Sequence, residues 1–241
     1  MSRSISITAF NRPELLKQVV DSILANDTTG FTHCYCGIEP EMQEQNFKEL
    51  TRLQERFETF ECVFNKSNLG VRKNPFNLLK YVFNPINNID FNLYLEDDSL
   101  LSPDAFDFVR HHLKHFMANE IMACNLYNYN STYTSPNAVS KIFDFCALGF
   151  GITKRQWMTW FEPYWFDENI RIKNRIDMEG KGGWDWSIRA VMKEFGLHNI
   201  APDLSRSYHL GVDGVHCDKE CFDKMFKNHP YSKYPKTNFK V

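Results

Sequence analysis

The stretch Phe91-Asn92-Leu93-Tyr94-Leu95-Glu96-Asp97-Asp98-Ser99-Leu100 joins an apolar, strand-like run to three consecutive acids. Adjacent carboxylates repel one another unless a cation lies among them. Mg²⁺ and Mn²⁺ prefer carboxylate oxygens, and ligands of α/β proteins bind beyond the carboxyl ends of the sheet strands. The run therefore predicts a site for a metal ion and a diphosphate. A simpler alternative is a strand end at which Asp98 or Ser102 caps the helix that begins near Pro103.

Strands and helices alternate through the first half of the chain. Pro13 follows a strand-like segment directly, and apolar residues then recur at helical spacing, which predicts a β-turn-α opening. This alternation predicts an α/β fold with one mostly parallel sheet and helices on both faces, so that the acids lie at its carboxyl edge. The expected strands are residues 5–10, 31–38, 61–65 and 91–95, and the expected helices are residues 13–24, 41–57 and 74–83.

The second half is less regular, with no internal repeat and no low-complexity linker. We expect a single domain over residues 1–223, followed by a basic and aromatic C-terminal tail over residues 224–241. The elements expected in this half are strands at residues 121–126 and 143–150 and helices at residues 103–117, 156–165 and 184–195.

Composition limits the class of protein. A chain of 241 residues with 43% hydrophobic residues has enough apolar side chains for a packed core. The formal net charge of -2 gives no general attraction to nucleic acid or to acidic membranes. From Lys224 onward, however, aromatic residues alternate with five lysines and no acid. Such a segment is suited to gripping phosphates and stacking on bases or sugars, so the tail either binds nucleic acid or packs on the domain.

The cysteines and the N-terminal residues bear on the cellular compartment of the protein. Seven cysteines is an odd number, and most of them lie inside apolar runs, which is typical of reduced core thiols. A strand-like segment begins almost at the first residue, and no apolar run reaches the length of a membrane span. We therefore expect a cytoplasmic protein without a transmembrane segment.

Four short pieces carry a family resemblance. They are Thr8-Ala9-Phe10-Asn11-Arg12-Pro13, Asn68-Leu69-Gly70-Val71-Arg72, Glu96-Asp97-Asp98, and Gly183-Trp184-Asp185-Trp186 followed by Pro202-Asp203-Leu204-Ser205-Arg206-Ser207. In this order, across residues 4–216, the chain resembles the GT-A glycosyltransferases, and within them the protein O- and N-linked N-acetylglucosaminyltransferases of the alpha-1,3-mannosyl-glycoprotein 2-beta-N-acetylglucosaminyltransferase family. The resemblance implies a Rossmann-like GT-A sheet and an inverting, metal-dependent transfer from a nucleotide-diphosphate sugar. It favours a UDP-sugar, with UDP-N-acetylglucosamine as the specific expectation.

The resemblance also implies residue roles. Asp98 would bind Mn²⁺ (or Mg²⁺) between the two phosphates, because a metal stabilises the departing diphosphate without a proton transfer. The other residues that it assigns to the nucleotide sugar are Arg12, Glu39, Arg72, Glu96 and Asp97. For the charged residues that follow strands, the simpler alternative is a solvated side chain at a loop end.

Asp185 is the candidate general base. An inverting transferase needs one carboxylate to take the proton of the acceptor hydroxyl as its oxygen attacks the anomeric carbon. Trp184 and Trp186 flank Asp185, and we expect Trp184 to contact the sugar. The alternative is that Asp185 caps the helix that runs to Phe195, and the two roles are compatible.

Two histidines lie in the Gly-punctuated segment 207–216. In related enzymes such a loop folds over the donor, and neutral imidazole is a competent Mn²⁺ ligand. His216 is the expected second metal ligand, and His209 is the less favoured one. A zinc site built from His216, Cys217 and Cys221 is rejected because no further ligand pair follows at zinc-finger spacing.

The sequence leaves the acceptor open among a glycan, a protein and a hydroxylated nucleobase in DNA. Two other functions compete with glycosyl transfer. A nucleotidyltransferase would carry a Gly-rich, basic phosphate loop after its first strand, and Asn11-Arg12-Pro13 is not such a loop. A carbohydrate or nucleic-acid binding module without turnover would not need both Asp98 and Asp185.

Overall fold

The computed structural model describes residues 1–114, 120–176, 183–212 and 218–234. Their largest sheet has the strand order β3-β2-β1-β4-β8-β6-β9-β7, and a small second sheet pairs β10 with β5. The strands are β1 (Arg3–Ala9), β2 (His33–Ile38), β3 (Thr59–Phe64), β4 (Phe91–Glu96), β5 (Ser99–Leu101), β6 (Ile121–Asn125), β7 (Val139–Ile142), β8 (Phe150–Thr153), β9 (His198–Pro202) and β10 (Ser207–His209).

Parallel pairing dominates the first half of the sheet. β1 pairs in parallel with both β2 and β4, and β2 pairs in parallel with β3. The later strands are mixed, because β8 runs antiparallel to β4 and β6, β7 runs antiparallel to β9, and β6 and β9 are parallel. The expected mostly parallel α/β sheet is therefore confirmed, and β4 lies at its centre, where it delivers the acids to the carboxyl edge of the parallel half.

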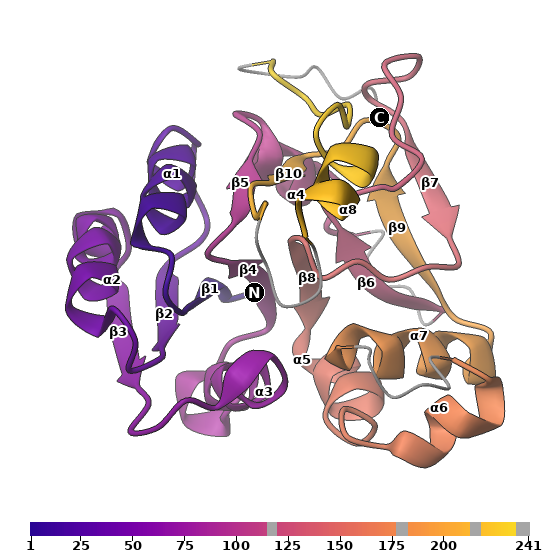
Figure 1. Cartoon of the computed structure of the whole chain (residues 1–241), viewed down its shortest axis with the longest axis horizontal. Coiled ribbons are helices and arrows are strands. Elements are labelled where there is room, and N and C mark those ends of the chain that lie inside the picture. The colour runs from indigo at the N-terminus through magenta and orange to yellow at the C-terminus, as the bar shows by residue number, and fades with distance from the viewer. Residues whose placement is uncertain (115–119, 177–182, 213–217, 235–241) are drawn as a thin grey trace.

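Helices cover both faces of this sheet (Figure 1). In α1 the buried residues Leu16, Val19, Val20 and Ile23 recur at helical spacing, and Pro13 starts the helix. The helices are α1 (Pro13–Leu24), α2 (Gln43–Leu50), α3 (Gly70–Val82), α4 (Ala105–His112), α5 (Lys154–Gln156), α6 (Glu168–Asn174), α7 (Trp184–Phe195) and α8 (Lys219–Met225), with 3-10 turns η1 (Thr51–Arg56) and η2 (Pro85–Asn87) and the π-helical turn η4 (Trp157–Phe161).

Two hydrophobic clusters lie on the two faces of the sheet. Side chains alternate between the faces along β4, so Leu93 and Leu95 pack with α1 and α4, while Tyr94 packs on the other face with α3 and α7. All three side chains are fully buried. Burial on both faces explains why β4 is mostly apolar before Glu96, and the buried side chain of Asn92 is hydrogen-bonded to Ser4 and Ser6.

Several expected boundaries differ from the structure. The helix expected at residues 41–57 is divided into α2 and η1, and the strand expected at residues 143–150 is wrong, since β7 ends at Ile142 and β8 begins at Phe150. Of the helix expected at residues 103–117, the described part is α4. Short apolar runs do not reveal from sequence alone where a strand leaves the sheet.

The C-terminal segment packs on the rest of the chain as far as residue 234. α8 spans the expected domain boundary at residue 223, and Figure 1 shows it beside β10. Beyond it, the amide of Ser232 donates to the carbonyl of Ser205 (2.8 Å), and Ser131 Oγ donates to the carbonyl of Pro230 (2.7 Å). The described part of the tail is thus attached to the domain by hydrogen bonds to its backbone.

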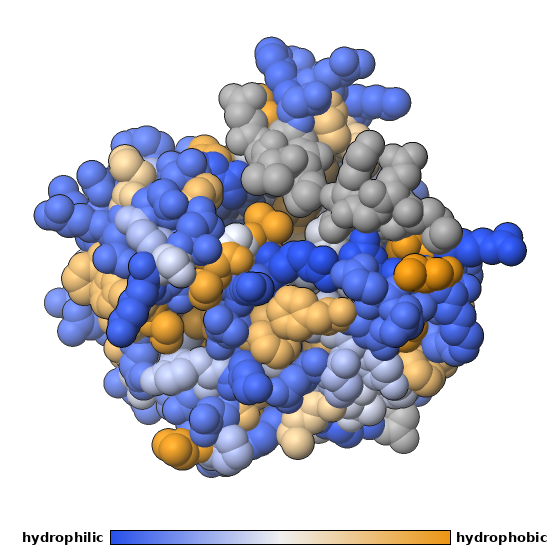
Figure 2. All heavy atoms as spheres, turned by 60° about the horizontal axis from the view of Figure 1, so that its bottom comes forward, coloured by the Kyte–Doolittle hydropathy of each residue, from blue (hydrophilic) through white to orange (hydrophobic). Residues whose placement is uncertain are grey.

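The outer surface carries apolar side chains in separate patches. In Figure 2 the molecule is turned so that the bottom of Figure 1 comes forward. On this face, polar residues (blue) separate the hydrophobic patches (orange). Val71 on α3, together with Phe166 and Ile172, is exposed. None of the helices in the described part of the chain combines the length and apolar composition needed to cross a membrane.

Candidate functional site

An arginine pairs with two of the three acids at the end of β4. Asp97 and Asp98 are almost fully buried. The guanidinium of Arg12, in the loop between β1 and α1, donates to Asp97 Oδ1 and lies 2.7 Å from Asp98 Oδ2. The amide of Phe10 also donates to Asp97 (2.9 Å). Because β1 and β4 are parallel neighbours, Arg12 is placed directly beside the acids. The guanidinium thus supplies one positive charge among the acids.

The acids differ in their protonation. Burial raises the pKa of Glu96 to about 8, and the charges of Asp98 and Asp97 add to this effect. Burial likewise raises the pKa of Asp97 to about 6, against the opposing influence of Arg12. Burial alone would raise the pKa of Asp98, yet His209 and Arg12 together hold it below its ordinary value. Asp98 is therefore the acid best suited to remain ionised at neutral pH.

His209 is brought to the acids by the small sheet. β10 pairs antiparallel with β5, and His209 lies opposite Ser99, the residue after Asp98. His209 Nδ1 is 3.6 Å from Asp98 Oδ1, which is too far for a hydrogen bond. Within the part of the chain that the structure describes, both atoms are buried without a hydrogen-bond partner. Two unsatisfied buried polar atoms that face each other need an explanation, and an ion bound between them is one.

The residues present fit a divalent cation. Arg12 occupies Oδ2 of Asp98 and leaves Oδ1 for a ligand, and a carboxylate oxygen and an imidazole nitrogen are both ligands of Mn²⁺. Among the residues that the structure describes, no three His, Cys, Asp or Glu side chains form a complete metal site. Two protein ligands are nevertheless typical of ions that also bind substrate phosphates. His216, the expected second ligand, lies outside the described residues.

Gly211 allows the chain to pass close to these groups. A Cβ at this position would lie 2.6 Å from Asp98 Oδ2, 2.8 Å from His209 Cε1 and 3.0 Å from Arg12 Nη1. The amide of Leu210 also donates to the carbonyl of Asp98 (2.9 Å). Glycine is thus required by close packing of the backbone against the site.

Asp185 approaches the same edge of the sheet from α7. It lies in the first turn of the helix, whose N-cap is Gly183, so the alternative that Asp185 itself is the cap is wrong. A Cβ on Gly183 would be 2.6 Å from Asp185 Oδ1, which shows that the carboxylate bends back over the helix start. The charge of Asp185 contributes to the raised pKa of Glu96, after burial and the charges of Asp98 and Asp97. The structure therefore brings Asp185 near the acids of β4.

Trp184 does not fit the expected contact with a sugar. Only 3% of it is exposed, and its ring stacks on Trp165 at a centroid distance of 4.2 Å. Tyr94 and Phe145 pack against its edges. The first position of α7 points into the core because the helix buries this face against the sheet. Trp186, two residues later, is only partly buried.

Glu39 and Arg72 are engaged with other parts of the protein. Glu39 is buried at the end of β2 and accepts hydrogen bonds from the amides of Leu69 and Gly70 (3.1 and 3.0 Å), so it anchors the turn before α3. Arg72, in the first turn of α3, forms an ion pair with Glu168 (2.8 Å). Their expected contacts with a nucleotide remain predictions.

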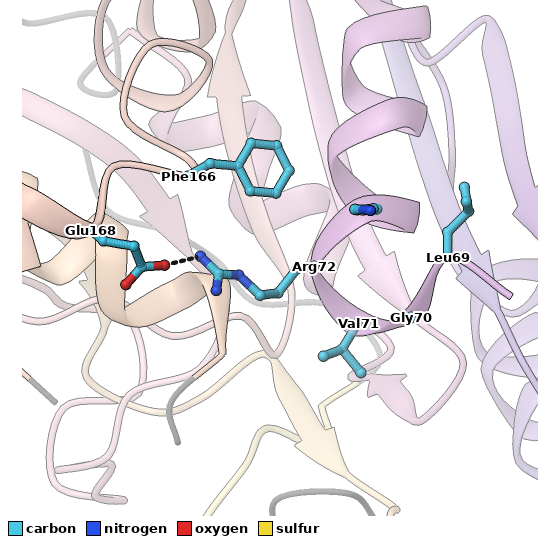
Figure 3. Close-up of a pocket in the computed structure, with 7 residues that line it drawn as sticks. Leu69, Gly70, Val71, Arg72, Phe166 and Glu168 are labelled. Carbon is cyan, nitrogen blue, oxygen red and sulfur yellow. Dashed lines mark hydrogen bonds and ion pairs between the residues drawn. The ribbon is translucent and has the colours of Figure 1, made fainter. Parts of the chain in front are cut away.

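A shallow pocket lies between the start of α3 and the segment before α6. Figure 3 shows Arg72 reaching across it to Glu168, with the ring of Phe166 on one side. The guanidinium carbon of Arg72 is 5.8 Å from the centre of that ring. The residues that line the pocket are Leu69, Gly70, Val71, Arg72, Lys73, Phe166 and Glu168.

Sequence reasoning missed the group around Arg189. This residue forms a bidentate pair with Asp144, with Nε–Oδ1 and Nη2–Oδ2 distances of 2.6 and 2.8 Å. Its guanidinium lies 4.8 Å from the ring centre of Trp186. The i, i+3 spacing of Trp186 and Arg189 on a helix was the available signal. Asp144 lies far from Arg189 in the sequence, so no sequence pattern indicated their pairing.

Comparisons with known proteins agree on the fold. No family model matches this sequence. Among solved structures, residues 1–349 of S. aureus TarS in complex with UDP-GlcNAc align with a TM-score of 0.53 at 13% identity, covering 89% of this chain and 60% of that chain. The same fragment in complex with UDP aligns with a TM-score of 0.52 at 14% identity, covering 86% and 60%.

A third structure is less similar. Mannosyltransferase PcManGT from Pyrobaculum calidifontis, in complex with GDP-Man and Mn²⁺, aligns with a TM-score of 0.47 at 12% identity, covering 65% of this chain and 45% of that chain. Of these three solved chains, this chain spans at most 60% of the length. The likeness to TarS confirms the expected GT-A fold. The finer resemblance to the 2-beta-N-acetylglucosaminyltransferase family remains a prediction.

Proposed function

We propose that this chain is an inverting, metal-dependent glycosyltransferase that transfers a sugar from a nucleotide-diphosphate sugar, with a UDP-sugar favoured, to an acceptor hydroxyl. The observation that carries the proposal is the meeting of three groups at one sheet edge. Asp98 Oδ1 and His209 Nδ1 face each other without hydrogen-bond partners in the described ranges, and the charge of Asp185 acts on Glu96. The fold shared with a protein solved in complex with UDP-GlcNAc supports the class of donor.

Asp98 and His209 are the residues that would hold a divalent ion. When bound, such an ion supplies a positive charge that stabilises the departing diphosphate. Arg12 keeps Asp98 oriented and ionised, and Asp97 holds Arg12 in place from its other side. The buried position of both carboxylates strengthens these charge interactions compared with a solvated site.

Asp185 would act as the general base. Its carboxylate takes the proton of the acceptor hydroxyl while that oxygen forms a bond to the anomeric carbon. The bond between the anomeric carbon and the diphosphate oxygen breaks, and its electron pair leaves with the nucleotide diphosphate. Attack from the face opposite the leaving group inverts the anomeric configuration. The start of α7 favours the ionised form of Asp185, since a helix N-terminus stabilises negative charge.

The test combines donor binding with turnover. Thermal-shift and calorimetric measurements with UDP-, GDP- and dTDP-sugars, each with and without Mn²⁺, should show metal-dependent stabilisation that Asp98→Ala abolishes. Asp185→Asn should bind the same donor and lose turnover, including the slow hydrolysis of the donor by water. Asp223→Asn, which alters a surface carboxylate of α8, is the matched control and should behave as the wild type.

Two results would contradict the proposal. Absence of binding by every donor, with and without Mn²⁺, would favour a binding module without turnover. Full donor hydrolysis by Asp185→Asn would remove this residue from the reaction and with it the proposed single-base mechanism.

A further inference from the structure

The surface beside Asp185 carries aromatic side chains that the donor site does not use. Trp186 is partly buried in the first turn of α7, and Tyr129, in the loop after β6, retains 39% exposure. Arg189 lies between them, with its guanidinium carbon 4.8 Å from the ring centre of Trp186 and 6.0 Å from that of Tyr129. The cation therefore connects two rings that come from distant parts of the chain.

Neighbouring residues fix the positions of Arg189 and Tyr129. Asp144 binds Arg189 through two hydrogen-bonded contacts, and Arg189 Nε also donates to the carbonyl of Phe145 (3.3 Å). The ring of Tyr129 contacts that of Tyr127 at 5.2 Å in an edge-to-face arrangement. Rigid aromatic surfaces with fixed neighbours bind a ligand with a small loss of conformational entropy.

The group is next to the proposed base. The nearby thiol of Cys146 raises the pKa of Tyr129, with burial and the charge of Asp185 contributing. The same carboxylate acts on Cys146, whose pKa is raised to about 12 mainly by burial. Trp186 directly follows Asp185 in the first turn of α7, so one ring of the group is adjacent to the proposed base.

We propose that Trp186 and Tyr129, joined by Arg189, form the acceptor subsite and stack on a pyranose ring of an uncharged saccharide acceptor. This inference rests on the proposed function, because the acceptor hydroxyl must lie beside Asp185. Aromatic faces pack against the apolar C–H face of a sugar ring, whereas the hydroxyl groups of the sugar remain available to the neighbouring polar groups.

Charge favours a saccharide over nucleic acid. Arg189 is already paired with Asp144, and the charge of Asp185 beside it is negative. Nucleic-acid binding depends on lysine and arginine side chains that neutralise phosphates, and this surface offers no surplus of them among the described residues. The phosphates of a nucleic acid would be repelled by the carboxylate of Asp185, whereas a neutral sugar ring would not.

The experiment measures saccharide binding apart from donor binding. Saturation-transfer difference NMR is recorded on the full chain with methyl β-D-glucopyranoside, methyl β-D-galactopyranoside, methyl α-D-mannopyranoside and methyl N-acetyl-β-D-glucosaminide. A serine peptide and a single-stranded oligodeoxynucleotide containing 5-hydroxymethylcytosine are the competing probes. We expect at least one pyranoside to bind through one face of its ring. Trp186→Ala should weaken this binding about tenfold, Tyr129→Ala should weaken it less, and Trp186→Phe should retain most of it.

Controls separate this inference from the function on which it rests. Phe143→Ala removes an aromatic ring that is 79% exposed and packs on His198 outside the group, so it should leave saccharide binding unchanged. Donor binding in the presence of Mn²⁺ should be the same in Trp186→Ala as in the wild type. If the wild type binds a pyranoside but no donor, the proposed function fails while the saccharide surface stands.

The inference is overturned by any of three results. These are a Trp186→Ala variant that binds the pyranoside as the wild type does, absence of binding by all four pyranosides, or binding of only the peptide or the oligonucleotide.

Discussion

Nδ1 of His209 lies 3.6 Å from Oδ1 of Asp98, and neither atom has a hydrogen-bond partner among the described residues. A divalent ion held between the two atoms would satisfy both. His209→Ala should therefore weaken Mn²⁺ binding by tenfold or more, because it removes one of two protein ligands. Titration of Mn²⁺ followed by electron paramagnetic resonance measures the free ion directly. His33→Ala, on β2, is the control. Equal affinity in His209→Ala and the wild type would exclude His209 as a ligand.

Substitution of Gly211 is a second test of the proposed ion site at Asp98 and His209. Gly211→Ala places a methyl group 2.6 Å from Asp98 Oδ2, so the carboxylate or the backbone must move. We expect a loss of about 1–3 kcal/mol in the free energy of unfolding and weaker Mn²⁺ binding. Urea unfolding and the same titration measure the two effects. Val212→Ala, at the neighbouring position, should leave the Mn²⁺ affinity unchanged, although it removes methyl groups that pack on Phe222 and its neighbours. A Gly211→Ala protein with wild-type affinity would show that the close approach is unnecessary.

A buried ion pair holds β10 close to α4. Arg206 and Asp104 are both fully buried, and Arg206 Nε lies 3.0 Å from Asp104 Oδ2. Arg206 Nη2 also donates to the carbonyl of Pro136 (2.7 Å). Arg206→Met leaves an uncompensated buried carboxylate and should cost about 3–5 kcal/mol of stability. Urea unfolding of Arg206→Met, of Asp104→Leu and of the double variant tests this. If the pair interacts as described, the double variant loses less than the sum of the single losses.

His229 makes stability depend on pH. Burial lowers the pKa of His229 to about 4, below the ordinary value of 6.5. Its ring stacks on Tyr127 at 4.2 Å. Between pH 6.5 and pH 4 the unfolded chain binds a proton that the folded chain excludes, so the free energy of unfolding falls as the pH falls through this window.

The expected loss from this residue between pH 7 and pH 5 is about 1 kcal/mol, after allowance for its partial exposure. His229→Gln removes the effect. Its melting temperature should therefore fall less on acidification than that of the wild type. Equal shifts in the two proteins, measured by calorimetry at pH 7, 6 and 5, would contradict the assignment.

The two tryptophans of α7 should contribute to stability to different extents. Trp184 is buried against Trp165, so Trp184→Ala should cost about 3–5 kcal/mol of stability. Trp186 is partly exposed, and Trp186→Ala should cost less than about 1 kcal/mol. Chemical denaturation of both variants provides the comparison. A large loss of stability in Trp186→Ala, or a small one in Trp184→Ala, would contradict the assignment of Trp184 to the core and of Trp186 to the surface.

Part of the candidate site was predictable because it depends on strand order and local chemistry. Apart from Asn92, β4 is apolar on both faces until Glu96, so its sequence revealed a central strand and the position of the acids. The partners of those acids were harder to find. Arg12 was expected to contact a nucleotide, yet it pairs with Asp97 and Asp98, because β1 and β4 are neighbours in the sheet. His209 was the less favoured metal ligand until the pairing of β10 with β5 placed it beside Asp98.

By itself, the sequence determined an α/β chain with a mostly parallel sheet and an acidic site at its carboxyl edge, because periodicity and strand ends are local properties of the backbone. Only the tertiary structure decided which charges meet and which rings are exposed. Trp184 and Trp186 are two residues apart, yet one turns into the core and the other toward the surface. The packing of α7 on the sheet separates them, and this packing depends on side chains far away in the sequence.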